Sequence, residues 1–114
     1  MQKYSLLFII FIWVSCSLPE YNQVPADVLS ENKMQDILKD IHLAEGYLSI
    51  NPSPGDSNLR KAKGFYELIY KKHGVTETDF QKSMDYYCEH PVLLDSVYSK
   101  LIINLSEMET NLRK

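Results

Sequence analysis

The stretch Ile37–Glu45 constrains the fold of this chain more than any other. It lies within a segment, residues 31–50, in which apolar side chains recur at helical spacing. Spacings of three and four residues place these side chains on one face of an α-helix. A helix of this kind owes most of its stability to elements that cover its apolar face, so the rest of the chain is expected to supply them. The stripe consists of Met34, Ile37, Leu38, Ile41, Ala44 and Leu48.

Three further segments have the pattern of amphipathic helices, and no strand pattern competes with them. The first covers residues 58–73 and ends before Gly74, a good residue for a helix C-terminus. The second begins at a near capping box formed by Thr76 and Asp79, and it runs to Glu89. The third begins at Pro91 and runs to residue 112. The sequence therefore predicts an all-α fold, a small bundle or orthogonal array of about four helices.

The last helix carries a heptad-like series of apolar residues. This seam could face the core or form a coiled-coil surface between chains. We expect it to face the core, because three other helices need a partner for their own stripes. The seam consists of Leu94, Tyr98, Leu101, Leu105, Met108 and Leu112.

The N-terminal residues have the order of an export signal. Lys3 precedes the unbroken apolar run Leu6–Val14, and Ser15 and Cys16 follow it. The run is shorter than the roughly 20 residues that span a bilayer. Val14-Ser15-Cys16 resembles a bacterial lipoprotein lipobox, although Trp13 stands where that pattern prefers an aliphatic residue. The alternative is an ordinary cleaved signal that ends near a cysteine.

This order predicts three parts. Residues 1–15 form a lipoprotein signal peptide, which we expect as a detached helix, and residues 16–29 form the acylated Cys16 and a tether. Residues 30–114 form the helical domain. Two proline residues and the absence of a helical period favour an extended tether. Acylation of Cys16 would leave Cys88 without a partner in the chain, and we expect Cys88 to be a small buried hydrophobic residue.

Several short motifs together resemble those of a known family. They are Asp40-Ile41-His42-Leu43-Ala44-Glu45, the turn Lys72-His73-Gly74 and the pair His90-Pro91. In this order, they are similar to the pattern of small lipoproteins of Bacteroidota that form a domain of unknown function. The resemblance implies a lipid-anchored protein of the cell envelope and assigns it no catalytic activity.

Glu45 is the most informative polar residue, because a turn of about 100° per residue places it near the middle of the apolar face. His42 and Asp40 lie on the two flanks. We expect Glu45 to be a buried acid that accepts hydrogen bonds, rather than a general acid or base, because no nucleophile or cofactor motif accompanies it. The expected partners are Tyr66, Tyr70, Tyr87, Tyr98, His90 or Lys63.

Metal, cofactor and nucleic-acid functions have little support in the sequence. His42 and Glu45 form a single His-x-x-Glu pair, whereas helical bundles that hold metals use this pair twice with further Glu ligands. His90 precedes Pro91 and is expected to pack at a helix corner. The net charge of −3 argues against nucleic acid, because phosphate binding requires a concentrated basic surface. We predict no catalytic residue, metal site or cofactor.

Leu43, Tyr47 and Ile50 form a second apolar stripe, on the opposite side of the first helix from the core stripe. This stripe is the candidate interface. The leading hypothesis is a non-enzymatic accessory subunit of an envelope assembly, anchored by lipid in the outer membrane and facing the periplasm, with an envelope protein as its partner. The alternatives are a holdase-like or small-ligand-binding lipoprotein, and an enzyme that uses Glu45 with His42 or His90.

Overall fold

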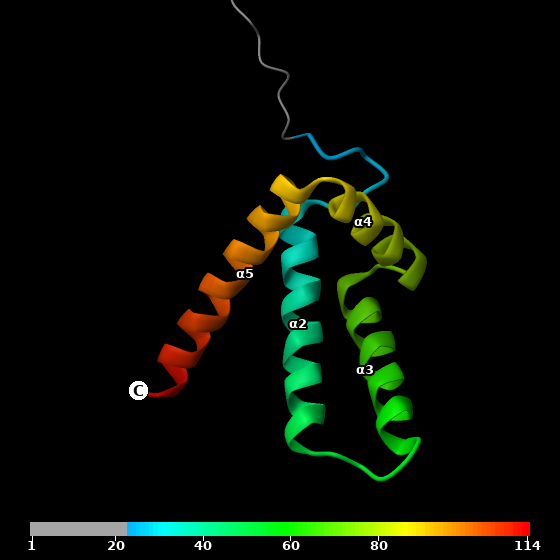
Figure 1. The fold of residues 1–114 in the computed structure, drawn as a ribbon, viewed down its shortest axis with the longest axis vertical. Coiled ribbons are helices and arrows are strands. Elements are labelled where there is room, and N and C mark those ends of the chain that lie inside the picture. The colour runs from blue at the N-terminus through cyan, green and yellow to red at the C-terminus, as the bar shows by residue number, and fades with distance from the viewer. Residues whose placement is uncertain (1–22) are drawn as a thin grey trace, which may run out of the picture.

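The computed structural model describes residues 23–114 and contains four α-helices and no strand in that range (Figure 1). The predicted all-α class is therefore confirmed. The predictions for the signal peptide, its detached helix and Cys16 fall on residues 1–22, outside the described part of the chain. The helices are α2 (Glu31–Ile50), α3 (Ser57–His73), α4 (Glu77–Glu89) and α5 (Pro91–Leu112).

Local capping signals fix the ends of these helices. Ser30 caps α2, because its side chain accepts a hydrogen bond from the Lys33 backbone N–H. Thr76 and Asp79 form the complete capping box that begins α4. Gly74 follows α3 with a φ of 66°, a left-handed conformation that glycine adopts at little cost. Pro91 occupies the first turn of α5, where its missing N–H leaves no helical bond unmade.

Helix α2 is the central element of the fold. It packs against α3 on one side and α5 on the other, and α4 crosses the end of the molecule where α2 begins (Figure 1). Helices α3 and α5 diverge from each other away from that end. The core is consequently densest near α4. Its buried apolar residues are Met34, Ile37, Leu38, Ile41, Ile69, Phe80, Tyr87, Leu93, Val97 and Leu101.

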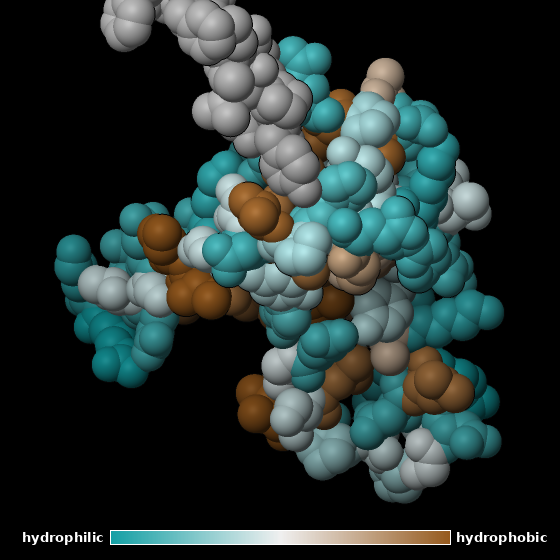
Figure 2. Space-filling view, turned by 45° about the horizontal axis from the view of Figure 1, so that its top comes forward, coloured by the Kyte–Doolittle hydropathy of each residue, from teal (hydrophilic) through white to brown (hydrophobic). Residues whose placement is uncertain are grey.

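The seam predicted along α5 faces the core as far as Leu105. Leu101 is buried, and Leu94, Tyr98 and Leu105 pack partly buried against the core. Met108 and Leu112 are exposed, so the prediction is wrong for the last two residues of the seam. The reason is that the C-terminal half of α5 runs away from α2 (Figure 1). Figure 2 shows apolar surface on this projecting part of the molecule.

The segment that enters α2 is bound to the domain, although the sequence predicted a tether as far as residue 29. Val24, Val28 and Leu29 pack against the core. The Leu29 N–H donates to Ser83 Oγ at 2.9 Å, and the Tyr87 hydroxyl donates to the Leu29 carbonyl at 2.8 Å. Both backbone groups of Leu29 are thus satisfied by α4, and residues 24–29 belong to the folded unit.

Within residues 23–114, no helix combines the length and apolar character that crossing a membrane requires. Helices α2 and α5 are long enough, at 20 and 22 residues, but each carries several charged side chains.

Candidate functional site

The polar side chains of the motif Asp40–Glu45 on α2 lie in different environments. Glu45 is not buried. Its side chain is 50% exposed, which corrects the expectation of a buried acid. The helical angle predicted for Glu45 is the same as that of the core stripe, but α4 does not cover α2 at this level. Helix α4 has only 13 residues and crosses α2 nearer its beginning (Figure 1). Glu45 therefore lies between the diverging α3 and α5.

Glu45 nevertheless links two helices. Tyr66 on α3 donates its hydroxyl to Glu45 Oε1 at 2.8 Å, so one of the expected partners is correct. This hydrogen bond to a carboxylate, together with burial, raises the pKa of the Tyr66 hydroxyl. His42 Nδ1 lies 3.5 Å from Glu45 Oε2, and the His42 ring meets the edge of Tyr98 on α5. The group therefore bridges α3, α2 and α5 across the open side of the molecule.

His90 lies at the corner between α4 and α5. Its Nδ1 is 2.7 Å from the Tyr86 carbonyl oxygen, and its ring stacks on the Tyr86 ring at 4.1 Å between centroids. This is the corner-packing role expected from its place before Pro91. The structure does bring His42 and Glu45 together, as an acid–base pair would require. Tyr66 and Tyr98 contact this pair.

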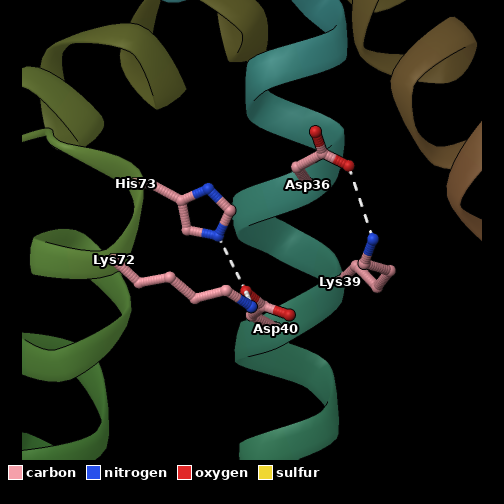
Figure 3. A network of polar contacts seen from close by, with 5 residues as sticks. All are labelled: Asp36, Lys39, Asp40, Lys72 and His73. Carbon is pink, nitrogen blue, oxygen red and sulfur yellow. Dashed lines mark hydrogen bonds and ion pairs between the residues drawn. The ribbon is translucent and has the colours of Figure 1, made fainter.

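Asp40, rather than Glu45, is the shielded acid of the motif. Its side chain is 14% exposed, and Oδ2 accepts hydrogen bonds from Lys72 Nζ and His73 Nε2, both at 2.7 Å (Figure 3). Burial alone would raise the pKa of the Asp40 carboxyl, but the hydrogen bonds from Lys72 and His73 outweigh it and hold that pKa below 3.8. The site thus joins the middle of α2 to the last turn of α3.

Replacing Asp40 with asparagine should lower the free energy of unfolding by about 1–3 kcal/mol near neutral pH, because the bonds from Lys72 and His73 lose their charged acceptor. A carboxyl whose pKa is depressed by folding stabilises the native state above its unfolded pKa and loses this effect as the pH falls. The difference between the wild type and Asp40→Asn should therefore be constant above about pH 5 and shrink below about pH 4, as urea unfolding would measure.

Asp36 provides the matched control for this measurement. It lies one turn earlier on α2, and its carboxylate pairs with Lys39 at 3.4 Å, but its side chain is 53% exposed (Figure 3). Water screens such a pair, so Asp36→Asn should change the stability by no more than about 0.5 kcal/mol. Equal losses for the two variants would contradict a special role for the shielded acid.

Two further predictions concern cysteine and metals. Cys88 is a free, exposed thiol on α4, so the expectation of a buried residue is wrong. It falls on the solvent side of α4, beside the fully buried Tyr87. Among residues 23–114, no three His, Cys, Asp or Glu side chains gather closely enough to hold a metal ion. Cys16 lies outside this range.

An apolar groove runs between α2 and α3 on the side away from the core stripe. It is lined by Leu43 and Tyr47 from α2 and by Phe65 and Leu68 from α3. The term apolar groove refers below to the surface that these four residues form. Tyr47 and Phe65 meet edge to face at 5.8 Å between ring centroids. Leu68 is 64% exposed, and Ile50 lies exposed near the end of α2. The sequence stripe pointed to Leu43, Tyr47 and Ile50, but it did not identify the contribution of α3.

These features define a small all-α protein with a shielded acid between two helices and an exposed apolar groove beside it. The chain belongs to the family described as Domain of unknown function (DUF4296), whose model matches residues 25–111. The match includes most of the bound entry segment and nearly all of the four helices. No curated protein and no solved structure matches the chain.

Proposed function

We propose that this protein is a lipid-anchored lipoprotein of the bacterial envelope that acts as a non-enzymatic interaction subunit. Acylation at Cys16 would hold it at the membrane, with the outer membrane and a periplasmic orientation as the setting. The support is the order of Lys3, the apolar run Leu6–Val14 and Ser15-Cys16, and the resemblance of the α2 motif to small lipoproteins of Bacteroidota. An accessory role in an outer-membrane assembly complex is consistent with these features.

The observation that carries the interaction role is the apolar groove. Leu43 and Tyr47 are about half exposed, and Leu68 is more exposed still. Contiguous exposed apolar surface commonly marks a binding site, and aromatic residues are enriched in the buried centres of interfaces. Tyr47 also carries a hydroxyl, so it can be stable both in water and against a partner.

The surroundings of the motif acids favour a structural role over a catalytic one. Asp40 is held by Lys72 and His73, which tie α2 to the end of α3. Glu45 accepts a hydrogen bond from Tyr66, which ties α2 to the middle of α3. Both carboxylates thus hold α2 to α3 through hydrogen bonds. These contacts also fix the two helices that form the groove.

The proposal is tested by recovering the tagged protein from mildly solubilised envelopes and identifying what accompanies it. We expect a reproducible envelope partner with the wild type. The double change Leu43→Glu and Tyr47→Glu should abolish its recovery, because it places two charges in the apolar surface. Both side chains are about half exposed, so the helical circular dichroism signal should persist.

Val92→Glu is the matched control. Val92 is an exposed apolar residue in the first turn of α5, distant along the fold from the groove, and an acid is favourable at a helix N-terminus. This variant should recover the partner as the wild type does. Recovery of the protein alone from wild-type envelopes would overturn the interaction role, and retention of the partner by the groove variant would overturn the assignment of the surface.

A further inference from the structure

A second apolar surface lies on the outer face of the C-terminal part of α5, and no other element within residues 23–114 covers it. We call residues 102–112 the α5 arm. Ile102 and Ile103 are 61% and 57% exposed, and Leu112 is exposed at the end of the helix. The arm projects from the rest of the domain in Figure 1, and Figure 2 shows apolar surface upon it. Its outer face also carries Glu107.

The arm cannot fill the groove of its own chain. Helix α5 packs on one side of α2 and α3 on the other, and the arm diverges from α2 (Figure 1). The groove lies between α2 and α3 on the side away from the core stripe. One chain therefore presents an amphipathic helix and a helix-lined groove that meet only between two copies.

Charge decides how two copies would pair. On the groove side, Lys72 pairs with Asp40, whereas Lys61 donates to the hydroxyl of Ser53 and has no ion pair within residues 23–114. Glu109 on the arm pairs with Arg113, whereas Glu107 has no ion pair among the described residues. Two arms or two grooves would each bring together surfaces whose unpaired charge has one sign, that of Glu107 or that of Lys61. An arm in a groove joins unpaired charges of opposite sign.

We propose that the α5 arm of one copy docks in the apolar groove of a second copy, with Glu107 beside Lys61, to form a reciprocal dimer. A two-fold arrangement makes this contact twice in one association, so two modest surfaces act together. It covers the exposed apolar side chains of the groove and of the arm. The proposal goes beyond the function above, and it implies that an envelope partner and a second copy compete for the same groove.

The test is the co-purification of two differently tagged full-length copies expressed together. The wild type should co-purify. Lys61→Glu alone and Glu107→Lys alone should each reduce the recovery about tenfold, since each replaces an attraction with a repulsion. The double variant carries the pair in reverse and should restore recovery to near the wild-type level. Both positions are exposed, so the fold should be unaffected.

Ile103→Glu should abolish co-purification, and Val92→Glu should leave it unchanged. Two results would overturn the proposal: no co-purification of wild-type copies, or a double variant as weak as the single ones. The dimer and the envelope partner are distinguished by Ile103→Glu, because it alters only the arm. That variant should still recover an envelope partner, so loss of one interaction does not imply loss of the other.

Discussion

Tyr87→Ala should cost about 3–5 kcal/mol of unfolding free energy, among the largest losses for a single residue in this domain. Tyr87 is fully buried on α4, and its ring packs in the core formed with α2 and α5. Its hydroxyl also donates to the Leu29 carbonyl. Removing the side chain creates a cavity and releases the entry segment. The free energy of unfolding of a small domain is about 5–15 kcal/mol in total, so Tyr87→Ala would remove a large fraction of it. Denaturant unfolding would measure this loss.

Tyr87→Phe separates the two contributions of this residue. The ring remains, but the Leu29 carbonyl loses its donor, so the expected loss is only about 1–2 kcal/mol. Burial raises the pKa of Tyr87 from 10.0 to about 12, and the hydroxyl therefore stays protonated as a donor at all ordinary pH values. Tyr86→Phe is the control on the adjacent, less buried ring. If Tyr87→Ala lost less than about 1 kcal/mol, the core placement would be contradicted.

The helix boundaries were predictable because their causes are local. Ser30, the Thr76–Asp79 box and Gly74 each act within a few residues of the helix end that they define. Pro91 acts in the same way at the start of α5. A single sequence contains all the information that such signals require. Helix angle was equally predictable, since the turn per residue is fixed, and Met34 and Ile41 lie in the core as expected.

Burial along a helix could not be predicted in the same way. Glu45 has the angle of a core residue but is half exposed, because α4 is too short to cover α2 at that level. Met108 and Leu112 continue an apolar seam but leave the core where α5 diverges. In both cases, the deciding quantity is the position of another helix, which depends on long-range packing rather than on local spacing.

The candidate site was also predicted only in part, because some of its contacts depend on how the helices pack against one another. Tyr66 was among the expected partners of Glu45, and the stripe of Leu43 and Tyr47 is exposed on the side opposite the core. The link from Asp40 to Lys72 and His73 joins residues more than 30 positions apart, so no local pattern indicated it. The sequence contained one indication of this link, which was the basic last turn of α3. An antiparallel hairpin of α2 and α3 would bring that turn near an acid of α2.

Cys16→Ser should abolish fatty-acid labelling of the protein and move it from the membrane fraction to the soluble fraction. The expectation rests on the proposed lipidation, since the sulfur of Cys16 would be the only attachment point for a thioether-linked lipid. Two or more acyl chains are needed for stable anchoring, so loss of the attachment should release nearly all of the protein. Metabolic labelling and fractionation would measure both effects.

Cys88→Ser is the matched control, because Cys88 is the other cysteine of the chain and its thiol is exposed. It should retain full labelling and membrane association. The bound entry segment adds a geometric consequence: with residues 24–29 held by α4, only residues 17–23 could separate the lipid from the domain, about 25 Å at full extension. Membrane retention of Cys16→Ser without labelling would show that the apolar run Leu6–Val14, rather than a lipid, holds the protein there.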